Sequence, residues 1–180
     1  YNGSWNGLTI ISIAIGQGEV TATPLQIANL SATIANRGYF ITPHVVKEVE
    51  DEPLDTLYSN KRYTKVRKEH YETVVQGMRA AVTGGTCRAA NLPGLDVCGK
   101  TGTAQNRGKD HSAFMGFAPM DNPKIAVSVY VENGGWGATY GVPIGALIIE
   151  KYLNGKLSAE SEIKARDIQN RRIDYGIHER

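Results

Sequence analysis

Long apolar runs are missing from this sequence. No stretch approaches the roughly 18 consecutive apolar residues that a membrane span requires, and the segment Tyr1–Trp5 has no signal-peptide pattern. An excess of one charge is missing too, because 20 lysines and arginines oppose 18 aspartates and glutamates, for a net charge of +2. That balance argues against nucleic acid or another polyanion as a partner. The sequence also has no initiating methionine, so we expect a soluble segment cut from a longer protein.

Cysteine is scarce as well. The two cysteines, Cys87 and Cys98, permit either one disulfide or two small buried thiols. A zinc site that combines them with His111 is not favoured, because the spacing provides neither a close cysteine pair nor a close histidine pair. No metal is therefore expected.

Enough apolar residues are present for one folded domain, since they make up 41% of the 180 residues. Helix signals are clearest at Thr23, which can cap a helix that begins at Pro24 and form a capping box with Gln26. A second apolar stripe at helical spacing predicts a helix over 68–82, and a third predicts one over 142–153.

Three strand-like stretches, 95–105, 112–118 and 124–131, follow the second helix with short polar connections. Short connections favour an antiparallel meander. The predicted fold class is α/β of the α+β type, with an antiparallel sheet flanked by helices. Residues 8–15 are strand-like in composition but also fit the start of a buried helix.

Two segments are predicted to lie outside the core. Residues 48–68 carry acidic residues followed by basic ones, which is typical of a solvated, self-neutralising connection. Residues 155–180 are charged with mixed sign and hold few large apolar side chains, so we expect a marginal helix or a disordered tail after a domain that ends at residue 154.

The segment Val97–Ala104 concentrates the residues with chemical potential. A strand at the edge of a sheet offers unpaired N–H and C=O groups to an extended peptide, and Gly102 allows a close approach. The cation of Lys100 can stabilise a carboxylate, and the N–H of Thr103 can donate to a developing oxyanion. Alternation puts Lys100 and Thr103 on opposite faces, so we expect a twist or bulge to help present them together. Taken alone, the motif favours a solvent-facing turn in an ordinary hairpin.

Further motifs accompany this segment along the chain. Together they resemble the C-terminal part of the transpeptidase domain of class B penicillin-binding proteins, over nearly all of residues 5–153, and are most similar to the elongation type, penicillin-binding protein 2. The motifs are Gly16-Gln17-Gly18, Thr23-Pro24-Leu25-Gln26-Ile27-Ala28, Ala35-Asn36-Arg37-Gly38, Gly99-Lys100-Thr101-Gly102-Thr103-Ala104, Phe114-Met115-Gly116-Phe117-Ala118-Pro119 and Val131-Glu132-Asn133-Gly134-Gly135.

The resemblance implies a serine enzyme that cross-links peptidoglycan stem peptides and is acylated by β-lactams. It implies catalytic roles for Lys100 and Thr103, and substrate binding by Thr101, Gly102 and Thr103. It further implies the periplasmic side of the inner membrane, a membrane anchor that precedes this chain, a glycosyltransferase partner of the elongation machinery and no cofactor. In such an oxidising compartment a Cys87–Cys98 disulfide becomes plausible.

Enzymes of this kind carry three boxes, Ser-x-x-Lys, Ser-x-Asn and Lys-Thr-Gly, and only the third stands in its expected order here. The resemblance places the nucleophilic serine, its lysine and the middle box upstream of Tyr1, so the isolated chain should be inactive. Ser161-Glu162-Ile163-Lys164 spells the first box, but it follows the third one in a charged tail. Two alternatives stay open: a non-catalytic sensor of β-lactams or muropeptides, and a relative of the serine β-lactamases.

Overall fold

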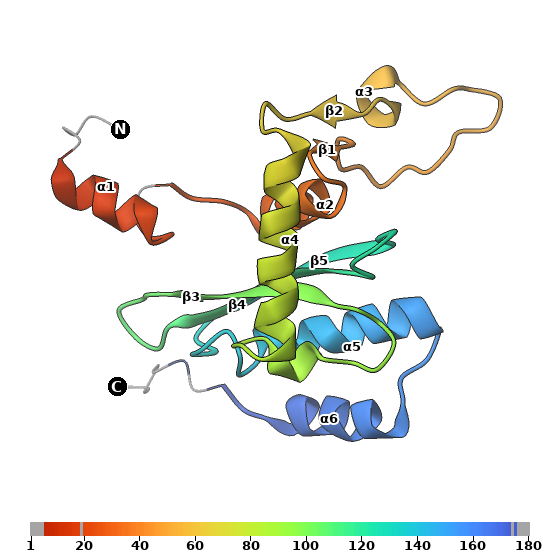
Figure 1. Cartoon of the computed structure of the whole chain (residues 1–180). Helices are drawn as coiled ribbons and strands as arrows, with labels where there is room; N and C mark the ends of the chain where they lie inside the picture. The colour runs from red at the N-terminus through yellow and green to blue at the C-terminus, as the bar shows by residue number, and fades with distance from the viewer. Residues whose placement is uncertain (1–5, 19, 174, 176–180) are drawn as a thin grey trace.

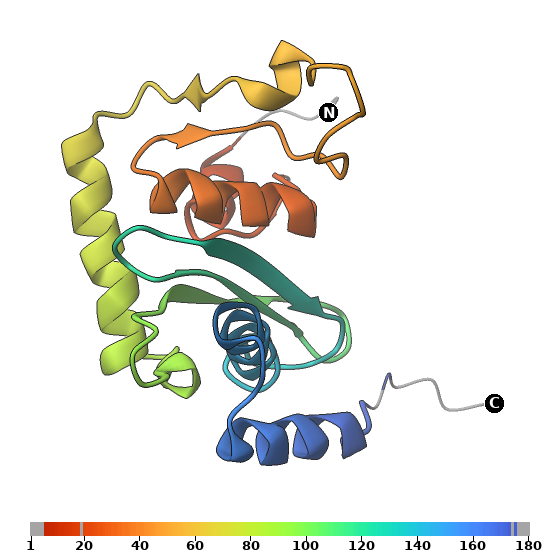
Figure 2. The same cartoon turned by 90° about the vertical axis from the view of Figure 1, so that its right-hand side faces the viewer.

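The computed structural model describes residues 6–18, 20–173 and 175. Its core is a three-stranded antiparallel sheet with helices on both faces, so that α2, the sheet, α5 and α6 succeed one another in layers (Figure 1, Figure 2). The strands are β1 (Tyr39–Phe40), β2 (Arg62–Tyr63), β3 (Cys98–Ala104), β4 (His111–Ala118) and β5 (Ile125–Val131). The helices are α1 (Gly7–Ala14), α2 (Pro24–Ala35), α3 (Thr56–Ser59), α4 (Lys68–Thr83), the 3₁₀ turn η1 (Arg88–Ala90), α5 (Gly141–Asn154) and α6 (Ala159–Asn170).

The sheet has the strand order β3-β4-β5, which confirms the predicted antiparallel meander. Pairing between β3 and β4 is continuous, from Cys98 opposite Phe117 to Ala104 opposite His111. Because β4 lies in the middle, β3 is paired along one side only within the part of the chain that the structure describes. The other side of β3 is therefore an edge of the sheet.

Apolar side chains fill the core on both faces of this sheet. One cluster joins the sheet to α5 and η1, and includes Phe114, Val129 and Ile149. The other joins the sheet to α2 and α4, and includes Phe117 and Met78. Since successive strand residues point to opposite faces, the single strand β4 supplies both clusters.

Three glycines make room for the ring of Phe114. A Cβ atom would lie 2.5 Å from this ring at Gly99, 2.6 Å at Gly116 and 2.4 Å at Gly145. Real Cβ atoms do not approach that closely, so a side chain at any of these positions would displace the ring. The close packing of β3, β4 and α5 therefore depends on these glycines.

The predicted helix signals are confirmed. Thr23 caps α2: the backbone N–H of Gln26 donates to Thr23 Oγ1 at 3.3 Å, and the Thr23 N–H donates to Gln26 Oε1 at 2.8 Å. Helices α4 and α5 cover the ranges expected from their apolar stripes, and Gly84 follows the end of α4.

Helix α1 settles the open alternative for residues 8–15. The segment is helical, and the Asn6 side chain caps it by accepting from the Thr9 N–H at 3.1 Å. It is not a buried helix, however, because Leu8 is 76% exposed and Ile11 61% exposed. Helix α1 lies to one side of the sheet (Figure 1).

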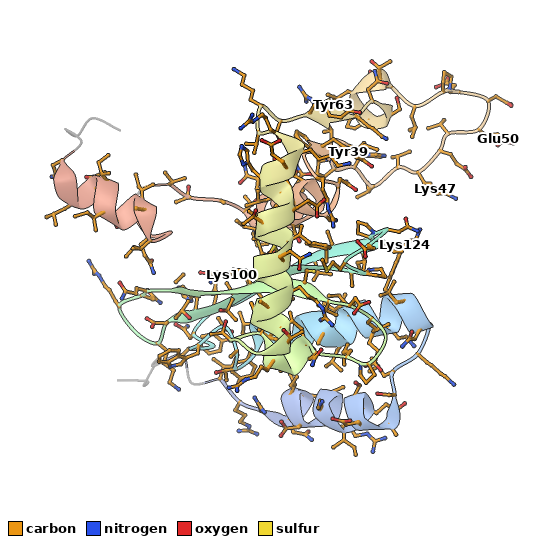
Figure 3. The ribbon with its side chains drawn as sticks, in the orientation of Figure 1. Tyr39, Lys47, Glu50, Tyr63, Lys100 and Lys124 are labelled. Carbon is orange, nitrogen blue, oxygen red and sulfur yellow. The ribbon has the colours of Figure 1, made fainter. Side chains whose placement is uncertain are left out.

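Residues 48–68, predicted to form a solvated connection, hold the short elements α3 and β2. Strands β1 and β2 pair as a small antiparallel sheet in which Tyr39 lies opposite Tyr63, with ring centroids 5.8 Å apart. The ammonium of Lys61 lies 4.4 Å from the Tyr39 ring centroid. Between the two strands a long excursion carries Lys47 and Glu50 away from the sheet (Figure 3).

The charged C-terminal segment forms α6, one of the two outcomes expected for it. The backbone N–H of Ser158, the N-cap of α6, donates to Glu150 Oε1 on α5 at 3.0 Å, and Ser161 is only 2% exposed. This polar contact helps hold α6 against α5, and Ile168 of α6 faces Ala146 and Leu147 of α5 across a shared pocket. In the described part of the chain, no helix has the length and apolar character needed to cross a bilayer.

Candidate active site

The outer edge of β3 carries the Lys-Thr-Gly segment. Lys100 is exposed on this strand, at the level of the sheet and far from the β1–β2 pair (Figure 3). Its Nζ donates to the carbonyl oxygen of Thr101 at 2.6 Å. The lysine side chain therefore folds across the edge of the sheet, so that its ammonium lies beside the backbone groups that an extended ligand would meet.

The side chains of Thr101 and Thr103 lie on the opposite face from Lys100, as strand alternation predicts. Thr101 Oγ1 hydrogen-bonds Thr86 Oγ1 at 2.9 Å. Thr103 Oγ1 accepts from the Gly137 N–H at 3.3 Å. The expected bulge is absent from β3, because its pairing with β4 is unbroken over residues 98–104. The Lys100 side chain reaches the outer edge without a bulge, since its Nζ lies on the Thr101 oxygen.

The backbone of Thr103 faces the outer edge. Its carbonyl oxygen accepts a hydrogen bond at 3.1 Å from Nε2 of Gln17, a residue that lies outside the sheet. In an antiparallel strand the N–H and C=O of one residue point to the same side, so the Thr103 N–H faces this edge too. The geometry fits the predicted role of this N–H as a donor to a developing oxyanion.

The glycine-rich segment 134–137 packs against the face of β3 that carries Thr101 and Thr103. A Cβ at Gly137 would lie 2.5 Å from the Gly102 oxygen and 2.6 Å from the Ala113 oxygen, so only glycine permits this contact. Buried Ser112 holds the same segment, because its Oγ donates to the Trp136 oxygen at 2.8 Å and accepts from the Gly141 N–H at 3.0 Å. These contacts hold the segment in place against the side chains of Thr101 and Thr103.

The disulfide that the sequence permitted does not form: both cysteines are free and fully buried. They belong to different core clusters, Cys87 on the α5 side of the sheet and Cys98 on the α4 side. Burial raises the pKa of the Cys87 thiol, against a smaller opposing effect of its hydrogen bond with Thr86. Burial also raises the pKa of the Cys98 thiol, to about 11. Both residues are packed thiols of low reactivity.

The Ser161–Lys164 match to the Ser-x-x-Lys pattern does not form a site. Ser161 is buried in the first turn of α6, and the ammonium of Lys164 pairs with Glu160 Oε1 at 2.8 Å. The serine is therefore inaccessible, and its lysine is engaged elsewhere. Over residues 6–18, 20–173 and 175, the side chains of His, Cys, Asp and Glu form no group of three that could hold a metal ion.

Sequence reasoning gave no individual role to three residues at this edge: Gln17, Thr86 and Gly137. Each contacts β3 from a distant part of the chain, between 15 and 86 positions away. Their one shared signal is a position beside or within a glycine-rich turn. Such turns punctuate many folds, so the pattern alone does not identify a contact with the site.

Comparison with known proteins identifies the family of this chain. Residues 1–153 match the penicillin binding protein transpeptidase domain family. The chain is 34% identical over 181 aligned positions to the peptidoglycan D,D-transpeptidase MrdA of Haemophilus influenzae, covering 87% of this chain and 28% of that protein. The chain therefore spans less than a third of this relative's length.

Two solved structures share the fold. The first is the crystal structure of Pseudomonas aeruginosa PBP2 in complex with WCK 5153, with a TM-score of 0.74, 36% identity and coverage of 88% of this chain and 36% of that one. The second is the imipenem acyl-enzyme complex of penicillin-binding protein A from M. tuberculosis, with a TM-score of 0.67, 32% identity and coverage of 79% and 33%. By sequence and by fold, this chain belongs to the penicillin-binding protein transpeptidase family.

Proposed function

We propose that this chain forms the Lys-Thr-Gly side of the active site of a serine peptidoglycan D,D-transpeptidase. The observation that carries the proposal is the outer edge of β3, where the Lys100 ammonium lies on the Thr101 oxygen and the Thr103 backbone faces outward. An edge of this kind binds an extended peptide through the main chain. The cation beside it suits a substrate that ends in a carboxylate.

The proposed reaction is acyl transfer. A serine hydroxyl attacks the carbonyl carbon between the last two D-alanines of a stem peptide, and its proton passes to a nearby base. The C–N bond then breaks, the departing D-alanine takes up a proton at its amino group, and an acyl-serine ester remains. An amino group of a second stem peptide attacks this ester, which forms the cross-link and returns the serine hydroxyl. β-Lactams acylate the same serine.

The residues of β3 take distinct roles. The Thr103 N–H donates to the oxyanion that forms when the serine attacks, and such a donor is typically worth about 100-fold to 1000-fold in rate. Lys100 and the hydroxyls of Thr101 and Thr103 bind the terminal carboxylate of the substrate. Gly102 leaves room for the acyl group, since a side chain there would already crowd Ala113 at 3.3 Å.

The proposal assigns the nucleophilic serine, its lysine base and the middle box to residues that precede Tyr1. Support comes from the order of the three boxes, of which only the third is placed correctly in this sequence. It also assigns an N-terminal membrane anchor, a position on the periplasmic side of the inner membrane and a glycosyltransferase partner. The family resemblance implies the anchor and the location, and likeness to a solved peptidoglycan synthase complex that coordinates polymerization and crosslinking supports the partner.

The test compares two polypeptides with a fluorescent penicillin, followed by mass spectrometry. The natural protein that contains this chain is expected to form a covalent adduct at an upstream serine, and the isolated chain is expected to form none. A stable adduct on the isolated chain would overturn the assignment of the serine. Reversible binding without an adduct in the natural protein would instead indicate a sensor module, and rapid hydrolysis of a cephalosporin would indicate a β-lactamase.

A further inference from the structure

Gln17 sits in a tight turn whose geometry is determined by the backbone. After α1, the Gly16 N–H donates to the Ile13 oxygen and the Gln17 N–H donates to the Ser12 oxygen, both at 2.9 Å. These two bonds, with Gly16 at a φ of +77°, form a Schellman motif at the helix end. Gly18 also has a positive φ, of +85°. The Gln17 side chain is thus held in a defined place, half-buried against β3.

The carboxamide of Gln17 pairs with β3 in the way a peptide group would. Its Nε2 donates to the Thr103 oxygen at 3.1 Å, and its Oε1 accepts from the Gln105 N–H at 3.4 Å. One amide that bridges residues i and i+2 of a strand reproduces the pairing of a neighbouring parallel strand. The outward N–H of Gln105, the residue that follows β3, is consequently occupied.

A strand edge alone does not define where a ligand pairs. A shift by two residues preserves both the face and the hydrogen-bond pattern, so Thr103 and Gln105 would offer equivalent outward N–H groups to an extended peptide. The two positions lie about 6.8 Å apart along the strand. A peptide shifted by that distance would put its reacting carbonyl out of reach of a serine placed for Thr103.

We propose that Gln17 is a positioning residue that sets the register of the substrate, because it withholds the Gln105 N–H and leaves the Thr103 N–H as the donor to the reacting carbonyl oxygen. The Thr103 oxygen has two lone pairs and can accept from Gln17 and from the substrate together. This inference rests on the proposed acyl transfer and adds a specificity determinant to it.

The experiment uses the natural protein and a stem-peptide analogue that ends in D-alanyl-D-alanine. Gln17→Met keeps the length of the side chain but removes both hydrogen bonds. In this variant part of the bound substrate pairs with Gln105, in a register that does not react. The maximal acylation rate and the half-saturating concentration therefore fall together, by about twofold if the two registers are equally stable. Their ratio stays unchanged. Gln76→Met, at an exposed position on α4, is the matched control and leaves all three quantities unchanged.

A second variant tests the cause. Gln17→Met combined with Gln105→Pro removes the competing N–H itself, and proline is tolerated at an edge whose N–H faces outward. The double variant is expected to recover the wild-type maximal rate. The proposal is overturned if Gln17→Met lowers the ratio while the half-saturating concentration stays constant, if it changes neither quantity, or if the double variant shows no recovery. A wild-type protein that is not acylated at all would overturn the proposed function itself.

Discussion

The two sides of β3 are built in different ways. Its inner side pairs with β4 over seven residues, and three glycines around Phe114 bring the neighbouring elements close to it. Its outer side has no strand beside it among the described residues and receives only side chains, from Lys100 and Gln17. The inner side therefore determines stability, while the outer side holds polar groups available to a ligand. Substitutions on the outer side should therefore leave the stability intact, and substitutions on the inner side should leave the polar groups of the outer edge intact.

The largest effect is expected on the inner side. Phe114→Ala in the natural protein should lower the free energy of unfolding by about 3–5 kcal/mol, because it empties a fully buried site between β3, β4 and α5. Urea denaturation measures the loss. Val45→Ala, at a 99% exposed position between β1 and β2, is the control with a small effect. A loss below about 1 kcal/mol for Phe114→Ala would mean that this ring is not central to the core.

The next largest effect is expected on the outer side of β3. Lys100→Ala should slow acylation by penicillin about 100-fold to 1000-fold, the range for loss of a charge-stabilising group at such a site. The urea midpoint should not change, because the Lys100 side chain is exposed. Lys124→Ala, on the far side of the sheet (Figure 3), serves as the matched control with wild-type rates. Wild-type acylation in Lys100→Ala would remove Lys100 from the site.

Gly137→Ala tests the point where the two sides meet. The new methyl group would lie 2.5 Å from the Gly102 oxygen, so the supporting segment must move away from Thr103. We expect a loss of about 1–3 kcal/mol in stability, together with slower acylation. Gly108→Ala is the control, since a Cβ there meets nothing closer than 4.0 Å. Equal behaviour of the two variants would contradict the packing described for Gly137.

The smallest effect is expected at the thiols. With both cysteines free, a reductant should leave the melting temperature of the natural protein unchanged. Because burial raises the pKa of Cys98 to about 11, its thiol stays protonated near pH 8. Alkylation by iodoacetamide should then require unfolding. A melting temperature that falls with reductant, or rapid alkylation of the folded protein, would count against these buried free thiols.

Much of the sheet and of the helices that cover it was predictable, because these elements follow local rules. The capping box at Thr23, the apolar stripe of α4 and the short turns of the meander are each encoded within a few residues. Composition was less reliable. Apolar α1 is exposed and charged α6 is docked, since docking depends on partner groups such as Glu150 that are distant in sequence.

The outer side was predictable only in part. The motif located Lys100 and Thr103, and alternation placed them correctly on opposite faces. The contacts of Gln17 and Gly137 with β3 were not predictable, because they join segments separated by tens of residues through single side-chain or backbone atoms. No periodic pattern in the sequence indicates such a contact.

The most direct test of the outer edge as the acyl-transfer site is a crystal structure of the natural protein acylated by penicillin. The account predicts that the carbonyl oxygen of the acyl group lies about 2.7–3.1 Å from the backbone nitrogen of Thr103, with the penicillin carboxylate beside Lys100. An acyl carbonyl that points away from β3, or an acyl group attached to Ser161, would contradict it.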